Sequence, residues 1–404
     1  MLTKKRNLKT GLTLWQFKTP HVIKTSTLPL KKFYDVVVIG GGVGGALASV
    51  AIVDGNRSIL LIDRRQPGHG STSASTALIQ WEIDEPLTSL AKKLGSKRAI
   101  ASYIAASVAV RQLAKLIKHL GIACDMKPRP TLLLAGTSMG AKELRSESNL
   151  RRRNKLSSTF LSKEELKKRF GIARAAAIYS TGSLELDPLK LTKGLLQHAQ
   201  ASGIEIISPV DVTDIQATRS GVFLTLDKNL VIAASKVIVA GGYESLPEIS
   251  NSGHKLNSTW ALATKPLSQE NPWPQSALVW EASDPYLYFR TTVDNRIVVG
   301  GEDEEFQDPK RRDAKIKTKS KVILRKLGLL LGRQDMEIDF QWAGTFATTP
   351  TGLPVIGEVP NLANVFAILG AGGNGITFSM IASKLALAWV KGVHHPSGAL
   401  FAPD

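Results

Sequence analysis

The sequence has a single cysteine, Cys124, in 404 residues. One cysteine cannot form an internal disulfide or a thiolate metal cluster, so we interpret Cys124 as a small buried hydrophobic residue, which fits a reducing compartment or indifference to one. Long apolar runs are missing too, and no segment approaches the roughly 20 apolar residues of a membrane-spanning helix. We therefore expect a cytoplasmic protein, with peripheral membrane contact as an open alternative.

Several catalytic and metal-binding motifs are also absent. The chain contains no HExxH, no paired cysteine ligands, no GxSxG and no P-loop. His394 and His395 are adjacent, and neighbouring side chains point too far apart to make a good pair of metal ligands. The sequence therefore predicts no metal site.

Aromatic residues make up only 6% of a chain whose net charge is +18. The positive charge concentrates before Asp35, in residues 142–174 and in residues 310–326. In the last run, apolar residues recur at helical spacing, which predicts that the lysines and arginines between them cover a solvated helix face. These apolar residues are Ile316, Ile323, Leu327 and Leu330. Because no aromatic residues interleave with the basic ones, nucleic acid is a disfavoured partner, left open on electrostatics alone.

The first 34 residues carry several lysines and no acidic residue, a composition that superficially resembles a mitochondrial transit peptide. Pro20 and Pro29 interrupt any long amphipathic helix. We therefore predict that residues 1–33 form a basic arm lying on the rest of the protein. Its expected apolar anchors are Leu14, Trp15, Phe17, Val22 and Ile23.

A dinucleotide-binding pattern begins at Asp35. The apolar run Val36–Ile39 predicts a parallel strand buried on both faces. Gly40 permits a tight turn, Gly42 lets the backbone approach a pyrophosphate, and Gly45 allows the following helix to pack closely on the strand. A lone GxGxxG motif is weak evidence for a dinucleotide site, but here the elements that surround such a motif are all present.

That context is a helix ending at Gly55, a second strand at Ile59–Ile62, and Asp63 at the end of this strand. The carboxylate lies about 20 residues beyond the glycines, where this fold needs an acceptor for ribose hydroxyls. An acid there disfavours a bound 2'-phosphate, although Arg64 and Arg65 follow directly.

Four separated segments together resemble the FAD-dependent oxidoreductase family that contains D-amino-acid oxidase, glycine oxidase and monomeric sarcosine oxidase. The first is the glycine pattern with Asp63. The second, Gly68–Gln80, resembles the family's small-residue loop beneath the flavin, and the third is Ala234–Ser245. The fourth, Thr349–Ser379, resembles its closing strand, glycine loop and helix.

The resemblance implies a bound FAD. Its tether in sarcosine oxidase is a cysteine, which matches Gly344 here, so the resemblance predicts non-covalent FAD. A helix starting near Ile376 would present unpaired N–H groups and the positive end of its dipole to the flavin, favouring the anionic reduced form. The expected cofactor residues are Gly40, Gly42, Gly44, Gly45, Asp63, Arg64, Ser71, Thr72, Ser73, Val212, Gly241, Gly372, Gly373, Asn374, Gly375 and Ile376.

The expected fold is α/β, with a Rossmann-like FAD domain that is discontinuous in sequence and a mixed-sheet, α+β substrate domain. We assign residues 34–85, 185–243 and 341–404 to the FAD domain. The substrate domain then takes residues 86–184 and 244–340. Asp187 and Pro188, which open a helical stretch, sit where the family has an Asp-Pro before the strand that completes the FAD domain.

The family's substrate-binding cations are missing at the matching positions, which are Gln80, Phe346 and Thr377. A small amino-acid carboxylate would be desolvated there without a partner, so glycine or sarcosine oxidation is disfavoured. Arg290 could replace the missing cations if its strand points Tyr288 and Arg290 at the flavin; a surface position for Arg290 is an equal alternative. We name Arg290, Gln80 and Thr377 as candidate catalytic residues.

These features predict an enzyme that transfers hydride from a C–H next to nitrogen, or less favourably next to oxygen, to flavin N5. Oxygen is one candidate electron acceptor, and a quinone or protein is another. Two further alternatives are oxidation of a modified tRNA base, which the charge would suit, and a non-catalytic nucleotide-binding module.

Overall fold

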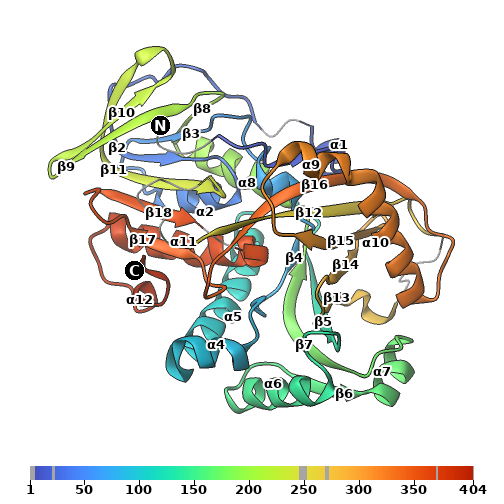
Figure 1. The fold of residues 1–404 in the computed structure, drawn as a ribbon. Helices are drawn as coiled ribbons and strands as arrows, with labels where there is room; N and C mark the ends of the chain where they lie inside the picture. Colours follow the sequence, from blue (N-terminus) through green and yellow to red (C-terminus); the bar gives the residue numbers. More distant parts are fainter. Residues whose placement is uncertain (1–4, 21–22, 245–252, 269–272, 370–371, 404) are drawn as a thin grey trace.

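The computed structural model describes residues 5–20, 23–244, 253–268, 273–369 and 372–403, which form two large sheets with helices around them (Figure 1). The eight-stranded sheet has the order β17-β18-β11-β2-β3-β8, extended by the β9–β10 hairpin. Its strands are β2 (Phe33–Ile39), β3 (Ile59–Ile62), β8 (Glu205–Ile207), β9 (Val212–Thr218), β10 (Gly221–Leu226), β11 (Val231–Gly242), β17 (Val355–Glu358) and β18 (Val365–Leu369).

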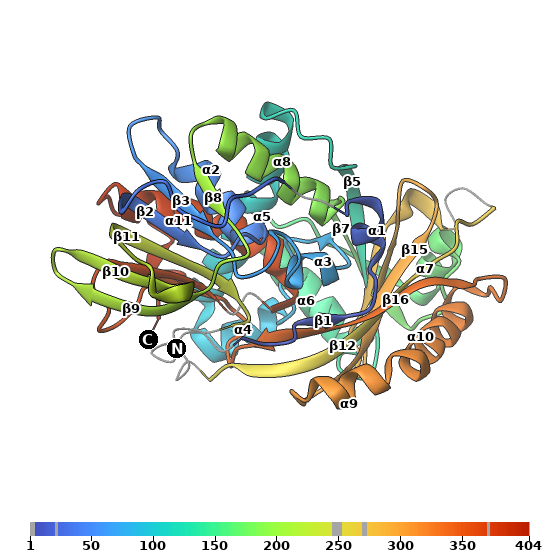
Figure 2. The same cartoon turned by 90° about the horizontal axis from the view of Figure 1, so that it is seen from above.

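The two faces of this sheet are covered differently. Strands β18, β11, β2, β3 and β8 run parallel, so their side chains are buried on both sides. Val36 and Val38 pack toward the helices, whereas Val37 packs with the β9–β10 hairpin residues Val222 and Leu224. Figure 2 shows the helices and the hairpin on opposite sides. The covering helices are α2 (Val43–Ile52), α8 (Pro188–Ala201) and α11 (Gly375–Val390).

The ten-stranded sheet has the order β1-β16-β12-β15-β14-β13-β5-β7-β4, with β6 paired to β7. Helix α10 (Ile316–Leu331) packs on β12, β15 and β16. The strands are β1 (Lys9–Thr10), β4 (Leu78–Ile79), β5 (Lys127–Leu134), β6 (Thr159–Ser162), β7 (Ala176–Glu185), β12 (Lys255–Thr264), β13 (Leu278–Glu281), β14 (Leu287–Thr291), β15 (Ile297–Glu304) and β16 (Ile338–Thr348).

The remaining helical elements range from single turns to a helix of 24 residues. They are α1 (Leu14–Lys18), α3 (Ser71–Ala74), α4 (Leu87–Leu94), α5 (Ser96–His119), α6 (Ala141–Arg153), α7 (Lys163–Phe170), α9 (Pro309–Ala314), α12 (Gly398–Phe401), and the 3-10 turns at Asp227–Asn229, Pro274–Ser276 and Gly372–Asn374.

The predicted fold class is confirmed, while the boundaries between its two parts differ in detail. Strand β16 extends to Thr348 and belongs to the ten-stranded sheet, although the sequence assignment began the last FAD segment at 341. The short strand β4 also joins this sheet, through β7. Both strands carry the chain across from one sheet to the other, which explains why the transition does not coincide with a turn in the sequence. Asp187 caps helix α8, accepting from the N–H groups of Leu189 and Lys190.

Helix α5 corrects the expectation that no segment is apolar and long enough to cross a membrane, since Ser96–His119 meets that test by length and composition. Its apolar face is buried, with Ala99, Tyr103, Ala106 and Leu113 all within the core. The helix contacts α4, α11 and β7. This packing is that of a core helix.

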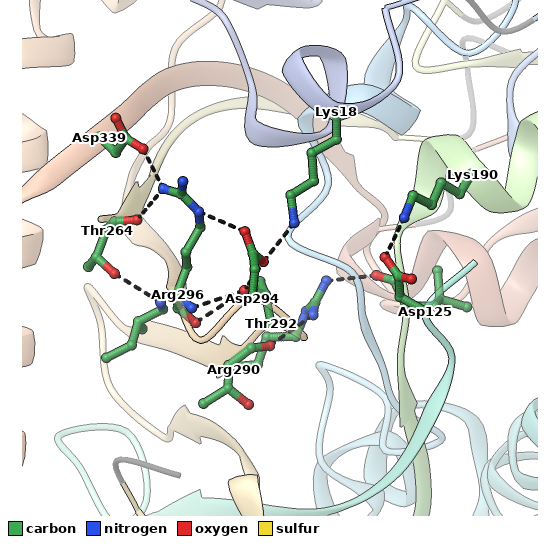
Figure 3. Close-up of polar contacts among 12 residues, drawn as sticks. Lys18, Asp125, Lys190, Thr264, Arg290, Thr292, Asp294, Arg296 and Asp339 are labelled. Carbon is green, nitrogen blue, oxygen red and sulfur yellow. Dashed lines mark hydrogen bonds and ion pairs between the residues drawn. The ribbon is translucent and has the colours of Figure 1, made fainter. Parts of the chain in front are cut away.

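The N-terminal segment is an arm laid across both sheets, as predicted, although part of it is helical. Leu14 and Trp15 are buried, and the indole Nε1 of Trp15 donates to the Ser75 carbonyl at 2.6 Å. Phe17 is 61% exposed but packs its ring on Phe340. Of the other expected anchors, Ile23 is half-buried against the core and Val22 lies outside the described residues. Lys18 joins the arm to Asp294 by an ion pair of 2.6 Å (Figure 3).

The basic run on helix α10 lies on the outer face of that helix. In α10, Ile323, Leu327 and Leu330 are buried and Ile316 is half-buried, which leaves the intervening lysines outside. Several of those lysines pair with carboxylates of β15, as Lys319 and Lys326 do with Glu302. The local charge is therefore partly neutralised by the protein itself.

Candidate functional site

A long cavity lies between the two sheets and forms the candidate site. One end is bounded by the turns that follow β2, β3 and β11, at the carboxyl ends of parallel strands, where α/β sheets bind ligands. The other end is walled by β13, β14 and β16 of the ten-stranded sheet. We call these the nucleotide end and the aromatic end.

The glycine turn after β2 brings backbone close to backbone at the nucleotide end. Gly40 has φ +109°, and a Cβ built on it would lie 2.4 Å from the Ala240 carbonyl oxygen. A Cβ on Gly45 would lie 1.8 Å from the Gly40 oxygen, so α2 sits directly against the turn, as the spacing predicted. Gly40, Gly42 and Gly44 line the cavity, whereas Gly45 lies behind them.

Asp63 is held by this same turn. One carboxylate oxygen accepts from the Gly41 N–H at 2.6 Å and the other from the Arg65 N–H at 2.7 Å. The side chain lines the cavity. Burial raises the pKa of Asp63 to about 6, although the two N–H donors lower it.

A charged corner beside Asp63 surrounds Glu244. Arg64 pairs with Asp211 at 2.8 Å and Glu244 at 3.3 Å, and Arg65 pairs with Glu244 at 2.6 Å. Arg64 and Val212 both line the cavity. Glu244 was not predicted; it follows β11 in a segment that showed no charged motif.

The small-residue loop enters as the short helix α3. Ser71 and Thr72 line the cavity, and the Thr72 hydroxyl accepts from the Val43 N–H at 3.0 Å. Ser73 is placed differently from the expectation: it is fully buried, bonds the Gly70 carbonyl at 2.9 Å and does not line the cavity. In a single helical turn, neighbouring side chains diverge, so all three cannot face one ligand.

The start of α11 forms the wall opposite. Gly241 and Gly372–Ile376 line the cavity, and residues 370–371 of the same loop lie outside the described residues. Asn374 precedes the helix and fixes the loop through its amide, which donates to the Glu82 carbonyl at 2.8 Å and accepts from the Asp84 N–H at 3.1 Å. The first turn of α11, whose N–H groups have no acceptor within the helix, therefore borders the cavity.

Three of the expected substrate-wall residues reach the cavity and one does not. Gln80, Phe346 and Thr377 line it, with the Thr377 hydroxyl donating to the Gln80 carbonyl at 2.7 Å. Tyr288 lines it as well. Arg290 corrects the prediction: it is 2% exposed and does not line the cavity.

Arg290 instead holds backbone together. Its guanidinium donates to the carbonyls of Thr76 at 2.7 Å, Leu186 at 2.7 Å and Thr291 at 3.0 Å, in the buried region shown in Figure 3. Its Cζ lies 5.1 Å from the centre of the Trp15 ring. Arg290 is on the same strand face as Tyr288, but the arm and the 74–79 segment cover that end of β14.

Several cavity residues carried no signal in the sequence. They come from six different elements or loops and meet only in the fold, so their spacing along the chain is uninformative. These residues are Leu8, Asp84, Tyr243, Thr259, Trp280 and Tyr286.

Comparison with known proteins agrees with this geometry. The chain is 22% identical over 373 residues to a probable oxidoreductase OrdL of Haemophilus influenzae, covering 89% of this chain and 83% of that protein. Its fold matches the crystal structure of glycine oxidase from Geobacillus kaustophilus, with a TM-score of 0.72 at 20% identity, covering 93% and 99% of the two chains. The L-α-glycerophosphate oxidase of Mycoplasma pneumoniae, solved with FAD bound, matches with a TM-score of 0.71 at 16% identity, covering 91% and 97%.

The family model named FAD dependent oxidoreductase matches residues 35–389, which include both sheets and every element of the cavity wall except the N-terminal arm. The glycine turn, Asp63 and the α11 start stand at the positions that the four sequence segments indicated. The chain belongs to the DAO family of FAD-dependent oxidoreductases.

Proposed function

We propose that this enzyme oxidises a small amine or amino-acid-like molecule at the carbon next to nitrogen, with FAD bound non-covalently. The single observation that supports this is the continuous cavity, which joins the glycine turn and Asp63 to the aromatic end. FAD, when bound, accepts the substrate hydride at N5. The substrate thereby becomes an iminium ion, which water hydrolyses to a carbonyl compound and an amine.

The residues at the nucleotide end fit the two halves of FAD. The turn at Gly40 and Gly42 has no side chains and would admit a pyrophosphate, and Asp63 would accept from a ribose hydroxyl. Ser71 and Thr72 would lie beside the ring system. The N–H groups at Gly375 and Ile376 would stabilise negative charge at the pyrimidine end.

The wall at the other end holds and orients substrate. Gln80, Phe346 and Thr377 form part of it. Among the described residues that line the cavity, the only lysines or arginines are Arg64 and Arg65, and both lie at the nucleotide end. A simple amino-acid carboxylate therefore finds no guanidinium beside the flavin, so the proposal favours amines.

We further propose a cytoplasmic location, with oxygen or a quinone or protein as the electron acceptor. The test is purification without added cofactor, followed by visible absorption before and after heat denaturation and centrifugation. Flavin bands that appear in the supernatant after denaturation, and that bleach anaerobically with an amine, support the proposal. A folded, colourless protein that refuses added FAD would contradict it.

Asp63 makes FAD affinity depend on pH. A ribose hydroxyl donates to the ionised carboxylate, so protonation of Asp63 as the pH falls through about 6 removes an acceptor. We expect the Kd for FAD to rise below that pH, by at most about tenfold per pH unit for one proton. Fluorescence titration of the apoprotein with FAD, repeated at pH values from about 5 to about 8, measures this change in Kd.

Asp303 provides the matched control, because burial raises its pKa to about 6 as well. Asp303→Asn should keep the pH slope, and Asp63→Asn should bind FAD weakly with no slope. A slope that persists in Asp63→Asn would show that another group titrates.

The N-terminal arm is expected to retain FAD. Leu8 lines the cavity, and its carbonyl accepts from the Thr345 N–H at 2.9 Å, while the Arg6 carbonyl accepts from Arg65 at 2.8 Å. Deleting residues 1–10 exposes this side of the cavity but keeps the Trp15 anchor. The expected result is a folded protein whose affinity for FAD is lowered about tenfold, because the contacts that the arm makes beside the cavity are lost. Unchanged FAD retention on a desalting column would contradict it.

A further inference from the structure

The aromatic end of the cavity is rich in aromatic side chains, which indicates the class of substrate. The inference drawn from it rests on the proposed function. Five aromatic side chains line it, contributed by the segment after β11 and by the ten-stranded sheet. They are Tyr243, Trp280, Tyr286, Tyr288 and Phe346. The rings of Tyr286 and Tyr288 lie 5.5 Å apart, tilted by 35°. Grouped ring faces attract an organic cation, and a quaternary ammonium in particular.

This end is also negatively charged. Asp84 lines the cavity, where it accepts from the Gly373 N–H at 2.9 Å, and it forms no ion pair with any lysine or arginine of the described chain. Asp84 is exposed to solvent, and the partial desolvation of its carboxyl raises the pKa. Asp303 lies next to the hydroxyls of Thr259 and Tyr286. The nearest arginines in the cavity wall already pair with Glu244 and Asp211.

Two buried side chains independently indicate that a polar ligand completes this end. Gln80 is 8% exposed and Trp280 is 9% exposed, and both line the cavity. The Gln80 Nε2 and Trp280 Nε1 atoms have no hydrogen-bond partner in the described chain. Buried donors are costly to leave unpaired, so a bound molecule is expected to supply a lone pair, which the uncharged reacting nitrogen of an amine has.

We propose that the substrate is an amine carrying a second, positively charged nitrogen, which binds between Asp84 and the rings of Tyr243, Tyr286 and Tyr288. The reacting nitrogen has to be uncharged to release a hydride from its neighbouring carbon, and the second nitrogen supplies the charge that this end recognises. A substrate with an anionic group here meets Asp84 instead and is repelled.

Binding of simple probes to the FAD-loaded enzyme tests this assignment without turnover. The probes are tetramethylammonium, the neutral tert-butanol of similar shape, and acetate, each titrated while the visible flavin spectrum is recorded. We expect tetramethylammonium to perturb the spectrum at concentrations at least about tenfold lower than the other two. Asp84→Asn, which keeps an oxygen for the Gly373 N–H, should weaken tetramethylammonium about tenfold and leave tert-butanol unchanged.

Asp214→Asn is the matched control, because Asp214 is exposed on β9, away from the cavity, and should change nothing. If Asp84→Asn fails to retain FAD, Tyr288→Leu is used in the same titration, with the same expected loss. Preferential binding of acetate, or equal binding of all three probes, overturns the assignment. If FAD is retained and amines bleach the flavin while tetramethylammonium does not bind, this inference fails and the proposed function stands. If the protein binds no FAD, both the proposed function and this inference are wrong.

Discussion

Replacing Arg290 with methionine is expected to lower the free energy of unfolding by about 3–5 kcal/mol, the cost of removing one partner from a buried charged network. Methionine fills much of the space but donates no hydrogen bond. The carbonyls of Thr76, Leu186 and Thr291 would then lose their donor inside the protein. Burial lowers the pKa of Arg290 to about 10, so the side chain is charged at neutral pH and these carbonyls bind a cation.

Denaturant unfolding of the FAD-loaded protein measures this loss. Arg174→Met is the control, because Arg174 is partly exposed and its ion pair with Glu281 should contribute less than about 1 kcal/mol. The Arg290 variant should retain its KM for an amine wherever it is folded. A variant of unchanged stability that binds FAD but has lost substrate affinity would return Arg290 to the substrate site.

Arg290 also shows where sequence reasoning reaches its limit. Strand alternation correctly predicted that Tyr288 and Arg290 share one face of β14, because that periodicity is local. Which part of this face meets the cavity depends on what packs over it. The cover consists of Trp15 and the 74–79 segment, which are more than 200 residues away along the chain. No local pattern specifies that contact.

The nucleotide end was predictable for the opposite reason. Strand, glycine turn, helix, strand and Asp63 occupy one continuous stretch, and each residue type is required by backbone geometry. The start of α11 was equally local, since glycine and asparagine precede an apolar helix. The placement of Ser73 could not be predicted, because a loop of small residues does not reveal which side chains point toward the cavity.

The aromatic end could not be predicted, because its members come from separate strands and loops. Asp84 follows β4 and Tyr243 follows β11. Trp280 lies in β13 and Tyr286 directly precedes β14, in a mixed sheet whose order is set by long-range pairing. Even the domain boundary at 341 moved, since β16 pairs with β12 over its whole length. Substrate recognition in this chain therefore depends on tertiary contacts, whereas cofactor recognition depends on a short motif.

The second large effect is expected from that motif: Gly45→Ala should abolish FAD binding. The added Cβ would lie 1.8 Å from the Gly40 carbonyl oxygen and 3.5 Å from the Ala240 Cβ. The oxygen belongs to backbone, which cannot rotate away, so helix α2 has to separate from the turn. Overpacking of this kind costs about 3 kcal/mol or more, and the displaced N–H groups no longer face the cavity.

Visible absorption of the purified variant and its circular dichroism measure the two consequences separately. Gly398→Ala is the control, because a Cβ at Gly398 meets nothing within 4 Å. Gly42→Ala should lie between them, since its Cβ would stand 3.1 Å from the Thr72 hydroxyl, a side chain that can shift by a few tenths of an ångström. We expect Gly45→Ala to lose the most FAD, Gly42→Ala to lose less, and Gly398→Ala to lose none. If Gly45→Ala bound FAD as tightly as Gly398→Ala, close packing of α2 on the turn would not be what forms the nucleotide end.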